Sequence, residues 1–523
     1  MKKENVIMGT LILSASSIFV RMIGFVFRIY LSNTLGAEGI GLYSLIMSLY
    51  ALCATVATSG ICTAVSKLVA EQLAWGNRAN GKRILRRAVT LSLSISVVVG
   101  LVVFLFSDFI AGTLLKDMRT ALSLRLLAPG MPFLSVSSSI RGYFLAERKM
   151  GNPATGQILE QFCKMAFIMG LLGVFLPRGL EYGCAVVVLG ITLGEAVCFA
   201  YSLGGFLLYR KQAATGRASI TGVVGSILKI AAPISLSSYI RSALRLAEDV
   251  LILSGLKLFS GQDDVATGLY GMLKGMVMPL LTFPLSMLSA FVVTLTPEIS
   301  RLGAQDNPQR MERTISMILR YTSIIGIFIV CLFMTFSYEL GIVIYKDERV
   351  GDMLRLMSFL CPFMCIEMVV VGILQGLGEQ VSSLRYSVSD CVLRIILVYL
   401  LIPMQGVNGF VIMVVASNLF TSLLNLRRLL KITKLHFRLN DWLLKPGLAA
   451  VAAGQGVRAL CNYWLFPQLS MWQGLAIGLI AMVAIYLAVL LSIGSVRPGD
   501  LSWITNRIKF SSKQPKSELE TVV

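Results

Sequence analysis

Apolar segments of about 20 residues recur from one end of this chain to the other, with no long polar stretch between them. A segment of this length is what an α-helix needs to cross the hydrocarbon core of a bilayer. Short polar connectors leave fourteen segments, so we expect an all-α integral membrane protein with about 14 transmembrane helices. The composition agrees, because 56% of the residues are hydrophobic and only 14% are charged, against roughly a quarter in soluble proteins. A sizeable soluble domain is therefore excluded.

Positive charge is concentrated in every second connector. The formal net charge is +20, and bases cluster at 78–87 and 427–445, whereas the odd connectors hold few bases and include Asp263 and Asp264. Under the positive-inside rule this alternation places the even connectors and both termini in the cytoplasm. The basicity therefore predicts a multi-pass protein of the plasma membrane and excludes nucleic acid as a partner. The first apolar run is too long for a secretory signal peptide, so we interpret it as a retained span.

The chain contains an internal repeat, because a shift of 230 residues carries one region onto another without a gap. The shift aligns Phe106 with Phe336, Lys116-Asp117 with Lys346-Asp347, Pro132-Phe133 with Pro362-Phe363, Glu160 with Asp390, and Lys164 with Arg394. We therefore expect two six-helix halves, which are parallel repeats because six is even, and transporters with such halves bind their substrate between them. The expected divisions are an N-terminal half at 1–210, a C-terminal half at 211–430, two additional transmembrane helices at 431–500 and a cytoplasmic tail at 501–523.

Two arginines interrupt the first apolar run. Arg21 and Arg28 are seven residues apart, so both leave a helix on the same side. A charge at mid-membrane costs roughly 2.5–3.5 kcal/mol unless the side chain reaches water, a partner or a ligand. The pair therefore predicts the basic wall of an internal cavity. The alternative is that the two side chains snorkel to the membrane surfaces or pair with acids elsewhere.

The seventh and eighth predicted spans carry further charges. Arg241, Arg245, Glu248 and Asp249 fall within nine residues, too many for a lipid-exposed helix. Arg245 can reach Asp249 one turn on, which leaves Arg241 as a candidate for the cavity. Lys274 precedes two prolines that bend its span, and it lies either in a gate or at the outer surface. The candidate substrate-binding residues are Arg21, Arg28, Arg241, Arg245 and Lys274.

Two acid–base pairs occupy equivalent positions of the repeat. Glu160 with Lys164, and Asp390 with Arg394, are spaced i and i+4, so each pair can meet on one helix face. They are either structural pairs that neutralise each other or an ion relay. Glu195 and Glu367 each stand alone in a predicted span, and their roles stay open between a hydrogen-bonded core group and part of an ion path.

Patterns typical of enzymes are missing from the sequence. There is no phosphate-binding glycine loop that ends in Lys-Ser/Thr, and no room for a nucleotide-binding domain. The ten cysteines lie almost entirely in predicted spans, and Cys361 and Cys365 have no histidine nearby, so we expect neither a metal site nor a cofactor. The expected protein is not an enzyme.

One motif resembles a known family. The stretch Val20 to Phe25 and the element Leu35-Gly36-Ala37-Glu38-Gly39 resemble the opening of the polysaccharide transporters, which belong to the multidrug, oligosaccharidyl-lipid and polysaccharide exporter superfamily. Within that superfamily the chain is similar to sporulation proteins of the stage V B type and more distantly to lipid II flippases. The resemblance implies that Arg21 falls on a cavity arginine of helix 1, that Arg28 lies one residue beyond the second, and that Lys274 is close to a basic position of helix 8. The sequence departs from the flippases between Gly39 and Ser66, where their helix 2 arginine has no equivalent.

The resemblance implies a flippase. It would move a polyprenyl-pyrophosphate-linked glycan, such as a peptidoglycan precursor, from the inner to the outer leaflet by alternating access of two halves. The expected partners are this anionic lipid-linked glycan, membrane lipids and cell-wall synthesis enzymes, and we expect a monomer. A cation-coupled multidrug antiporter and a non-transporting scaffold for wall synthesis are the alternatives. The sequence leaves the glycan and the energy source open.

Overall fold

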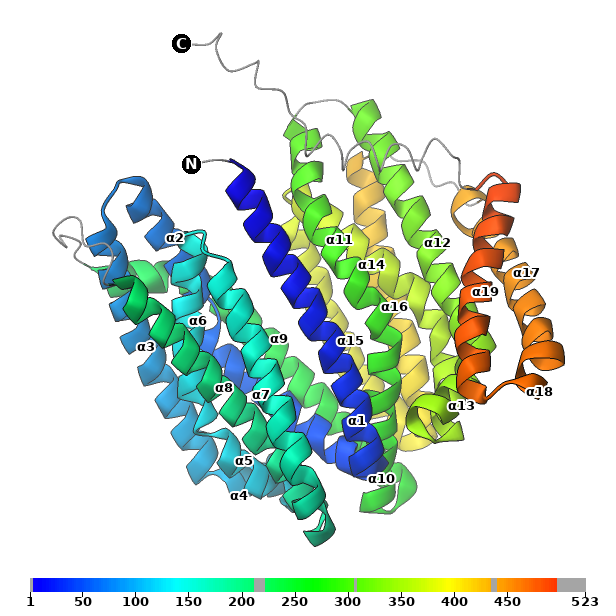
Figure 1. The fold of residues 1–523 in the computed structure, drawn as a ribbon, viewed down its shortest axis with the longest axis horizontal. Helices are drawn as coiled ribbons and strands as arrows, with labels where there is room; N and C mark the ends of the chain where they lie inside the picture. The colour runs from blue at the N-terminus through cyan, green and yellow to red at the C-terminus, as the bar shows by residue number, and fades with distance from the viewer. Residues whose placement is uncertain (1–2, 211–221, 305–307, 434–439, 496–523) are drawn as a thin grey trace. The chain divides into compact units, whose positions relative to one another are not determined.

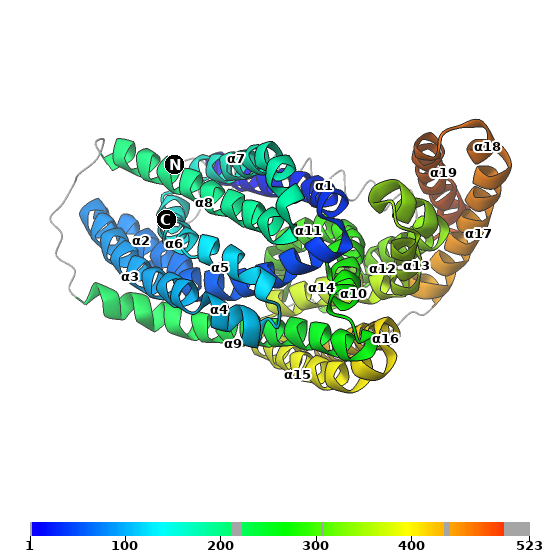
Figure 2. The same ribbon diagram turned by 90° about the horizontal axis from the view of Figure 1, so that it is seen from below.

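The computed structural model describes residues 3–210, 222–304, 308–433 and 440–495, and they form helices with no β-strand among them (Figures 1 and 2). The expectation of an all-α fold is confirmed. The predicted tail at 501–523 lies outside the described residues. Through residue 210 the elements are α1 (Lys3–Thr58), α2 (Ile61–Ala74), α3 (Arg78–Leu105), α4 (Ser107–Phe109), η1 (Ile110–Leu114), η2 (Met118–Thr120), α5 (Ala121–Leu127), α6 (Gly130–Ala146), α7 (Gly151–Phe175), η3 (Leu176–Arg178) and α8 (Leu180–Arg210).

The remaining elements are again helices and short helical turns. They are α9 (Val223–Ser260), α10 (Asp263–Tyr270), η4 (Gly271–Val277), α11 (Met278–Ala304), α12 (Pro308–Leu340), η5 (Gly341–Tyr345), α13 (Glu348–Met357), η6 (Ser358–Leu360), α14 (Cys361–Gly376), α15 (Gln380–Gln405), α16 (Val407–Thr433), η7 (Asn440–Leu444), α17 (Lys445–Leu460), η8 (Cys461–Leu465), α18 (Phe466–Gln468) and α19 (Met471–Ser492). The turns η1, η4, η5, η7 and η8 are π-helical.

Eleven stretches of the described chain are long and apolar enough to cross a membrane, so this is a multi-pass membrane protein. The first stretch, Ala15–Ala74, covers two of the predicted spans. The fourth and thirteenth predicted spans fall on α6 and α17, which have 17 and 16 residues and are continued by separate short helices. The number fourteen stays a prediction, because broken helices of this kind do not define a span by length alone.

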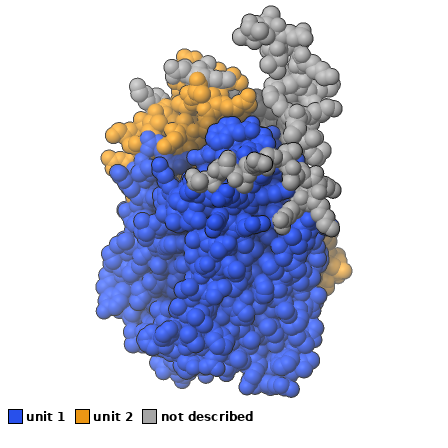
Figure 3. Space-filling view, turned by 90° about the vertical axis from the view of Figure 1, so that its left-hand side faces the viewer, with its two compact units in different colours: residues 1–294, 344–346, 379–421 blue, residues 295–343, 347–378, 422–523 orange. Residues whose placement is uncertain are grey.

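The described helices group into two compact units, coloured separately in Figure 3. Unit 1 contains residues 1–294, 344–346 and 379–421, and unit 2 contains 295–343, 347–378 and 422–523. Within unit 1, α7 packs on α8, α9 on α15, and α6 on α2, α3 and α8. Within unit 2, α12 packs on α13, α14 and α17, and Arg458 of α17 is paired at 2.8 Å with Glu339 of α12. These units group helices by contact, whereas the halves at 1–210 and 211–430 are defined by sequence correspondence and stay a prediction.

The long helix α1 is broken at Gly36, whose φ of 73° lies in the left-handed region that glycine tolerates best. Beyond the break, α1 packs closely against α10 and η4. A Cβ atom at Gly41 would overlap the carbonyl oxygen of Thr267, and one at Gly271 would overlap that of Ala37. Because both positions lack a side chain, the two backbones can lie in direct contact.

The repeated sequence adopts the same local structure in both copies. In each, a π-helical turn ends one or two residues before a lysine with left-handed φ, and the residue after the lysine is an aspartate that caps the following helix. The aspartate accepts a hydrogen bond from the backbone N–H of an arginine two positions later in the chain. Its carboxylate also forms an ion pair with the side chain of that arginine. The residues are Lys116, Asp117 and Arg119 in the first copy and Lys346, Asp347 and Arg349 in the second.

Candidate functional site

The first part of α1 presents the two arginines that the sequence singled out. Arg21 is exposed, and its Nη1 donates a hydrogen bond to the Ser289 hydroxyl at 2.8 Å. Arg28 is half-buried and donates from Nε to the carbonyl oxygen of Gly275 at 3.2 Å and from Nη2 to that of Lys274 at 3.0 Å. Neither guanidinium forms an ion pair with a carboxylate in the described part of the chain. Among the residues that the structure describes, both arginines are therefore cations without a neutralising carboxylate.

Arg28 also lines a cavity of about 150 Å³ in unit 1, which we call the α1–α7–α8 cavity. Its polar lining comes from Arg28 and Tyr43 of α1 and from Gln161 and Lys164 of α7. The rest of the lining is apolar, apart from the backbone of one glycine: Gly24, Phe27, Leu31, Ile168, Val187 and Ile191. The predicted pair of Lys164 with Glu160 is not among the ion pairs of the described residues. Two positive side chains thus line a small cavity that no carboxylate lines.

Lys274, on the π-helical turn η4, has a different environment from Arg28. Its ammonium lies 2.8 Å from Asp249 and 3.3 Å from Glu248, two neighbouring acids of α9. Its Nζ also lies 5.9 Å from the centre of the Phe410 ring. The Ser48 hydroxyl donates to the other oxygen of Asp249 at 2.5 Å. In this arrangement Lys274 is neutralised by carboxylates of its own protein.

The second acid–base pair of the repeat belongs to the same polar network. Arg394 and Asp390 of α15 are joined at 3.0 Å, and Arg394 also lies 3.8 Å from Glu248. Ser417 of α16 hydrogen-bonds to both members of the pair. We call Glu248, Asp249, Lys274, Asp390 and Arg394 the α9–α15 network.

The other two candidate arginines, Arg241 and Arg245, lie on α9 and are exposed. Arg245 does not pair with Asp249 as expected, because Lys274 and Ser48 occupy that carboxylate. Among the described residues, neither arginine forms an ion pair. The structure therefore brings Lys274 together with acids, whereas the four candidate arginines form no ion pair with an acid in the described ranges.

Glu195, whose role was open, is a buried residue of α8. It accepts a hydrogen bond from the Tyr50 hydroxyl at 2.9 Å. No group of three or more His, Cys, Asp or Glu suited to a metal ion was found among the residues that the structure describes.

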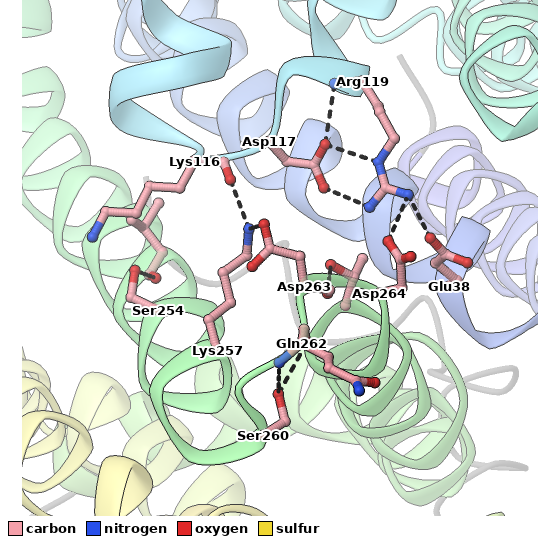
Figure 4. Close-up of polar contacts among 12 residues, drawn as sticks. Glu38, Lys116, Asp117, Arg119, Ser254, Lys257, Ser260, Gln262, Asp263 and Asp264 are labelled. Carbon is pink, nitrogen blue, oxygen red and sulfur yellow. Dashed lines mark hydrogen bonds and ion pairs between the residues drawn. The ribbon is translucent and has the colours of Figure 1, made fainter.

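Sequence reasoning missed an ion-pair cluster that joins α1, η2, α9 and α10 (Figure 4). Arg119 is held by Asp117 at 2.8 Å, by Asp264 at 3.3 Å and by Glu38, and the carboxylates of Asp117 and Glu38 raise its pKa. Beside it, Lys257 pairs with Asp263 at 3.0 Å and donates to the carbonyl oxygen of Lys116 at 2.8 Å. The repeated Lys-Asp step was the available signal, but the partners from α1 and α10 are distant in sequence.

This chain is similar to members of a polysaccharide biosynthesis family and to a solved flippase structure. The family model described as polysaccharide biosynthesis protein matches residues 6–303, and the MatE model matches residues 233–400. Stage V sporulation protein B of Bacillus subtilis (strain 168) is 26% identical over 510 residues, which cover 96% of this chain and 98% of the relative. Lipid II flippase MurJ of the same organism is 23% identical over 441 residues, covering 78% of this chain and 79% of that protein. A solved structure of lipid II flippase MurJ in an inward closed conformation has the same fold, with a TM-score of 0.70 at 14% identity over 92% of this chain and 98% of that one.

Proposed function

Because this chain belongs to the polysaccharide biosynthesis protein family, we propose that it is a flippase for an anionic, polyprenyl-pyrophosphate-linked glycan. The substrate moves from the inner to the outer leaflet by alternating access of the two repeated halves. A relative over nearly the full length is named a sporulation protein, and a more distant one is named a lipid II flippase. These names support a lipid-linked precursor of a wall polymer as the substrate class.

The observation that carries this proposal is the unneutralised charge of α1. Arg21 and Arg28 sit in an apolar helix, where a charge without a partner is costly, and neither has a carboxylate among the described residues. A guanidinium stays charged and pairs two phosphate oxygens at once, so an anionic headgroup is the ligand that offsets this cost. Arg21, Arg28, Arg241 and Arg245 are the proposed headgroup contacts.

The geometry of Lys274 favours this function over cation-coupled drug export. An exporter of that kind needs acids that are free to bind a cation, and the acids of the α9–α15 network are not free, because Lys274 and Arg394 already occupy Glu248, Asp249 and Asp390. We assign Lys274 to the proposed site as a lysine that its carboxylates release when a stronger anion is present. In the absence of substrate the network keeps it neutralised.

The test is flipping of lipid II by the full chain in proteoliposomes. Arg21→Ala should lower the rate about tenfold or more, because a hydrogen bond to a charged group is worth about 1.5–3 kcal/mol. Lys67→Gln removes one exposed charge from α2 and is the control that should flip at the normal rate. Normal flipping by a folded, inserted Arg21→Ala protein would contradict the proposal, whereas export of cationic dyes without lipid flipping would favour the exporter.

A further inference from the structure

We infer that Arg28 and Lys164 together form a phosphate-binding subsite in the α1–α7–α8 cavity. The inference rests on the proposed function and adds Lys164, a residue that sequence reasoning assigned only to a pair with Glu160. It also assigns the pyrophosphate to a defined place in unit 1.

The lining of the cavity carries positive charge. Of the ten residues that line the cavity, two are cationic and none is acidic. Gln161 and Tyr43 add an amide and a phenol, both of which can donate hydrogen bonds to phosphate oxygens. Neither cation forms an ion pair among the described residues, so an anion in the cavity would gain charge-assisted hydrogen bonds from both side chains. A lining with two basic side chains and no acid therefore favours an anion over a metal ion or a cationic drug.

The guanidinium of Arg28 is held in place by two backbone carbonyl oxygens. Its Nε and Nη2 each donate one hydrogen bond to a carbonyl oxygen of η4, at 3.2 and 3.0 Å. These two bonds use two of the five N–H groups of the guanidinium and fix its plane. The remaining donors are available to a ligand in the cavity that Arg28 lines. Arg28 is therefore oriented for binding before the ligand arrives.

Lys164 and its repeat equivalent, Arg394, differ in their ion pairs. Arg394 is engaged by Asp390 at 3.0 Å and by Ser417, whereas Lys164 has no ion pair in the described part of the chain. The nearby Glu195 is already hydrogen-bonded to Tyr50. Lys164 is thus the member of the two repeated bases that remains available to a ligand.

The cavity is small. A cavity of about 150 Å³ equals roughly five water volumes of about 30 Å³ each, and drug-sized ligands need about 300–1,000 Å³. The cavity therefore has the size of a phosphate or pyrophosphate group and is smaller than the pockets that hold drug-sized ligands. Polyprenyl pyrophosphate and free inorganic pyrophosphate share this chemistry, and the experiment separates them.

The experiment measures binding of polyprenyl pyrophosphate, polyprenyl monophosphate and inorganic pyrophosphate to the purified full chain by titration calorimetry. Lys164→Met should weaken binding of polyprenyl pyrophosphate about tenfold or more, and Lys164→Arg should stay within about threefold of the original protein. Lys67→Gln, which removes an exposed charge from α2, should bind normally.

A second variant tests the space and leaves the charge unchanged. Gly24 lines the cavity, and a Cβ atom there would lie in ordinary contact, 3.5 Å from Nε2 of Gln161. Gly24→Ala should therefore fold and keep most of the binding, whereas Gly24→Leu fills the cavity and should lower the affinity as much as Lys164→Met does. Loss of binding in both Lys164→Met and Gly24→Leu supports the subsite.

The outcomes separate the subsite from the function. Normal binding by Lys164→Met together with loss in Arg21→Ala would overturn the subsite and leave the proposed function intact. Failure of the unmodified protein to bind any polyprenyl pyrophosphate would overturn both. Equal affinity for inorganic pyrophosphate would support the subsite and overturn a lipid headgroup as its ligand.

Discussion

The two copies of the repeat place an acid and a base at the same spacing but in different environments. In the second copy, Asp390 and Arg394 are joined at 3.0 Å and are completed by Ser417 of the next helix. In the first copy, Lys164 lines a cavity and its ion pair with Glu160 is not found among the described residues. The i,i+4 spacing therefore permits an ion pair, and the packing of neighbouring helices decides whether the pair forms. A duplicated pair can thus keep a structural role in one copy and bind a ligand in the other.

The repeated turns differ in the same way. Arg119 and Arg349 form the same ion pair with Asp117 and Asp347, with 2.8 Å from Nη2 to Oδ2 in both copies. Arg119 then reaches two further acids and is 31% exposed, whereas Arg349 is 66% exposed. Identical local structure therefore contributes differently to the stability of the two regions.

The largest expected difference between the copies concerns the two bases. Arg394→Met should lower the free energy of unfolding by about 3–5 kcal/mol, because it leaves the half-buried Asp390 without its counterion. Lys164→Met removes a base that has no ion pair and should change stability by less than about 1 kcal/mol. Thermal unfolding of the purified proteins in detergent, followed by intrinsic fluorescence, measures both.

The double variant Asp390→Asn with Arg394→Met is the control for this prediction. It should recover a large part of the lost stability, because no charge is left unpaired. Equal loss of stability in Lys164→Met and Arg394→Met would show that Lys164 is also held by a partner, and the contrast between the copies would be wrong.

The equivalent glycines of the repeat give the next prediction. Gly41→Ala should destabilise the contact of α1 with α10 by about 1–3 kcal/mol, since its Cβ atom would overlap the Thr267 carbonyl oxygen. Gly268, which aligns with Gly41, has nothing within 4 Å of such a Cβ atom. Gly268→Ala should therefore stabilise the helix by about 0.5–1 kcal/mol, and the same thermal measurement checks both signs. A neutral Gly41→Ala variant would disprove the close contact.

A smaller effect should separate the two arginines of the repeated turns. Arg119→Gln should cost about 1.5 kcal/mol, because Arg119 bonds to three carboxylates in the cluster of Figure 4. Arg349→Gln should cost less than about 1 kcal/mol, as is usual for an exposed pair. High salt should reduce the cost at both sites. Equal costs would mean that Glu38 and Asp264 add nothing to the cluster.

The smallest effect is a pH dependence in the second turn. The hydrogen bond from Arg349 lowers the pKa of Asp347 below its ordinary value of about 3.9. A lowered carboxyl pKa contributes stability that is present above the ordinary value and is lost as the pH falls through the folded value. Thermal midpoints at about pH 6 and about pH 3 should therefore differ slightly more for the original protein than for Asp347→Asn. An identical difference in both proteins would exclude a contribution from this cap.

Much of the fold could be predicted from the sequence, because it depends on interactions between neighbouring residues. Apolar runs must be helical in lipid since no water satisfies their backbone there, and the all-α architecture follows. The hydrogen bond and ion pair between Asp117 and Arg119 are equally local, since the two residues are two positions apart. The Lys-Asp step recurs after 230 residues and brings the same turn with it.

Only the tertiary structure decided which charges meet. Lys274 of η4 pairs with Asp249 of α9 within unit 1, and Arg245 forms no ion pair with that carboxylate among the described residues. Lys164 lines a cavity because α1, α7 and α8 enclose one around it. The physical reason is that a helix fixes the direction of its own side chains, whereas a partner on another helix depends on how the two helices pack, and the sequence of one helix alone does not determine that packing.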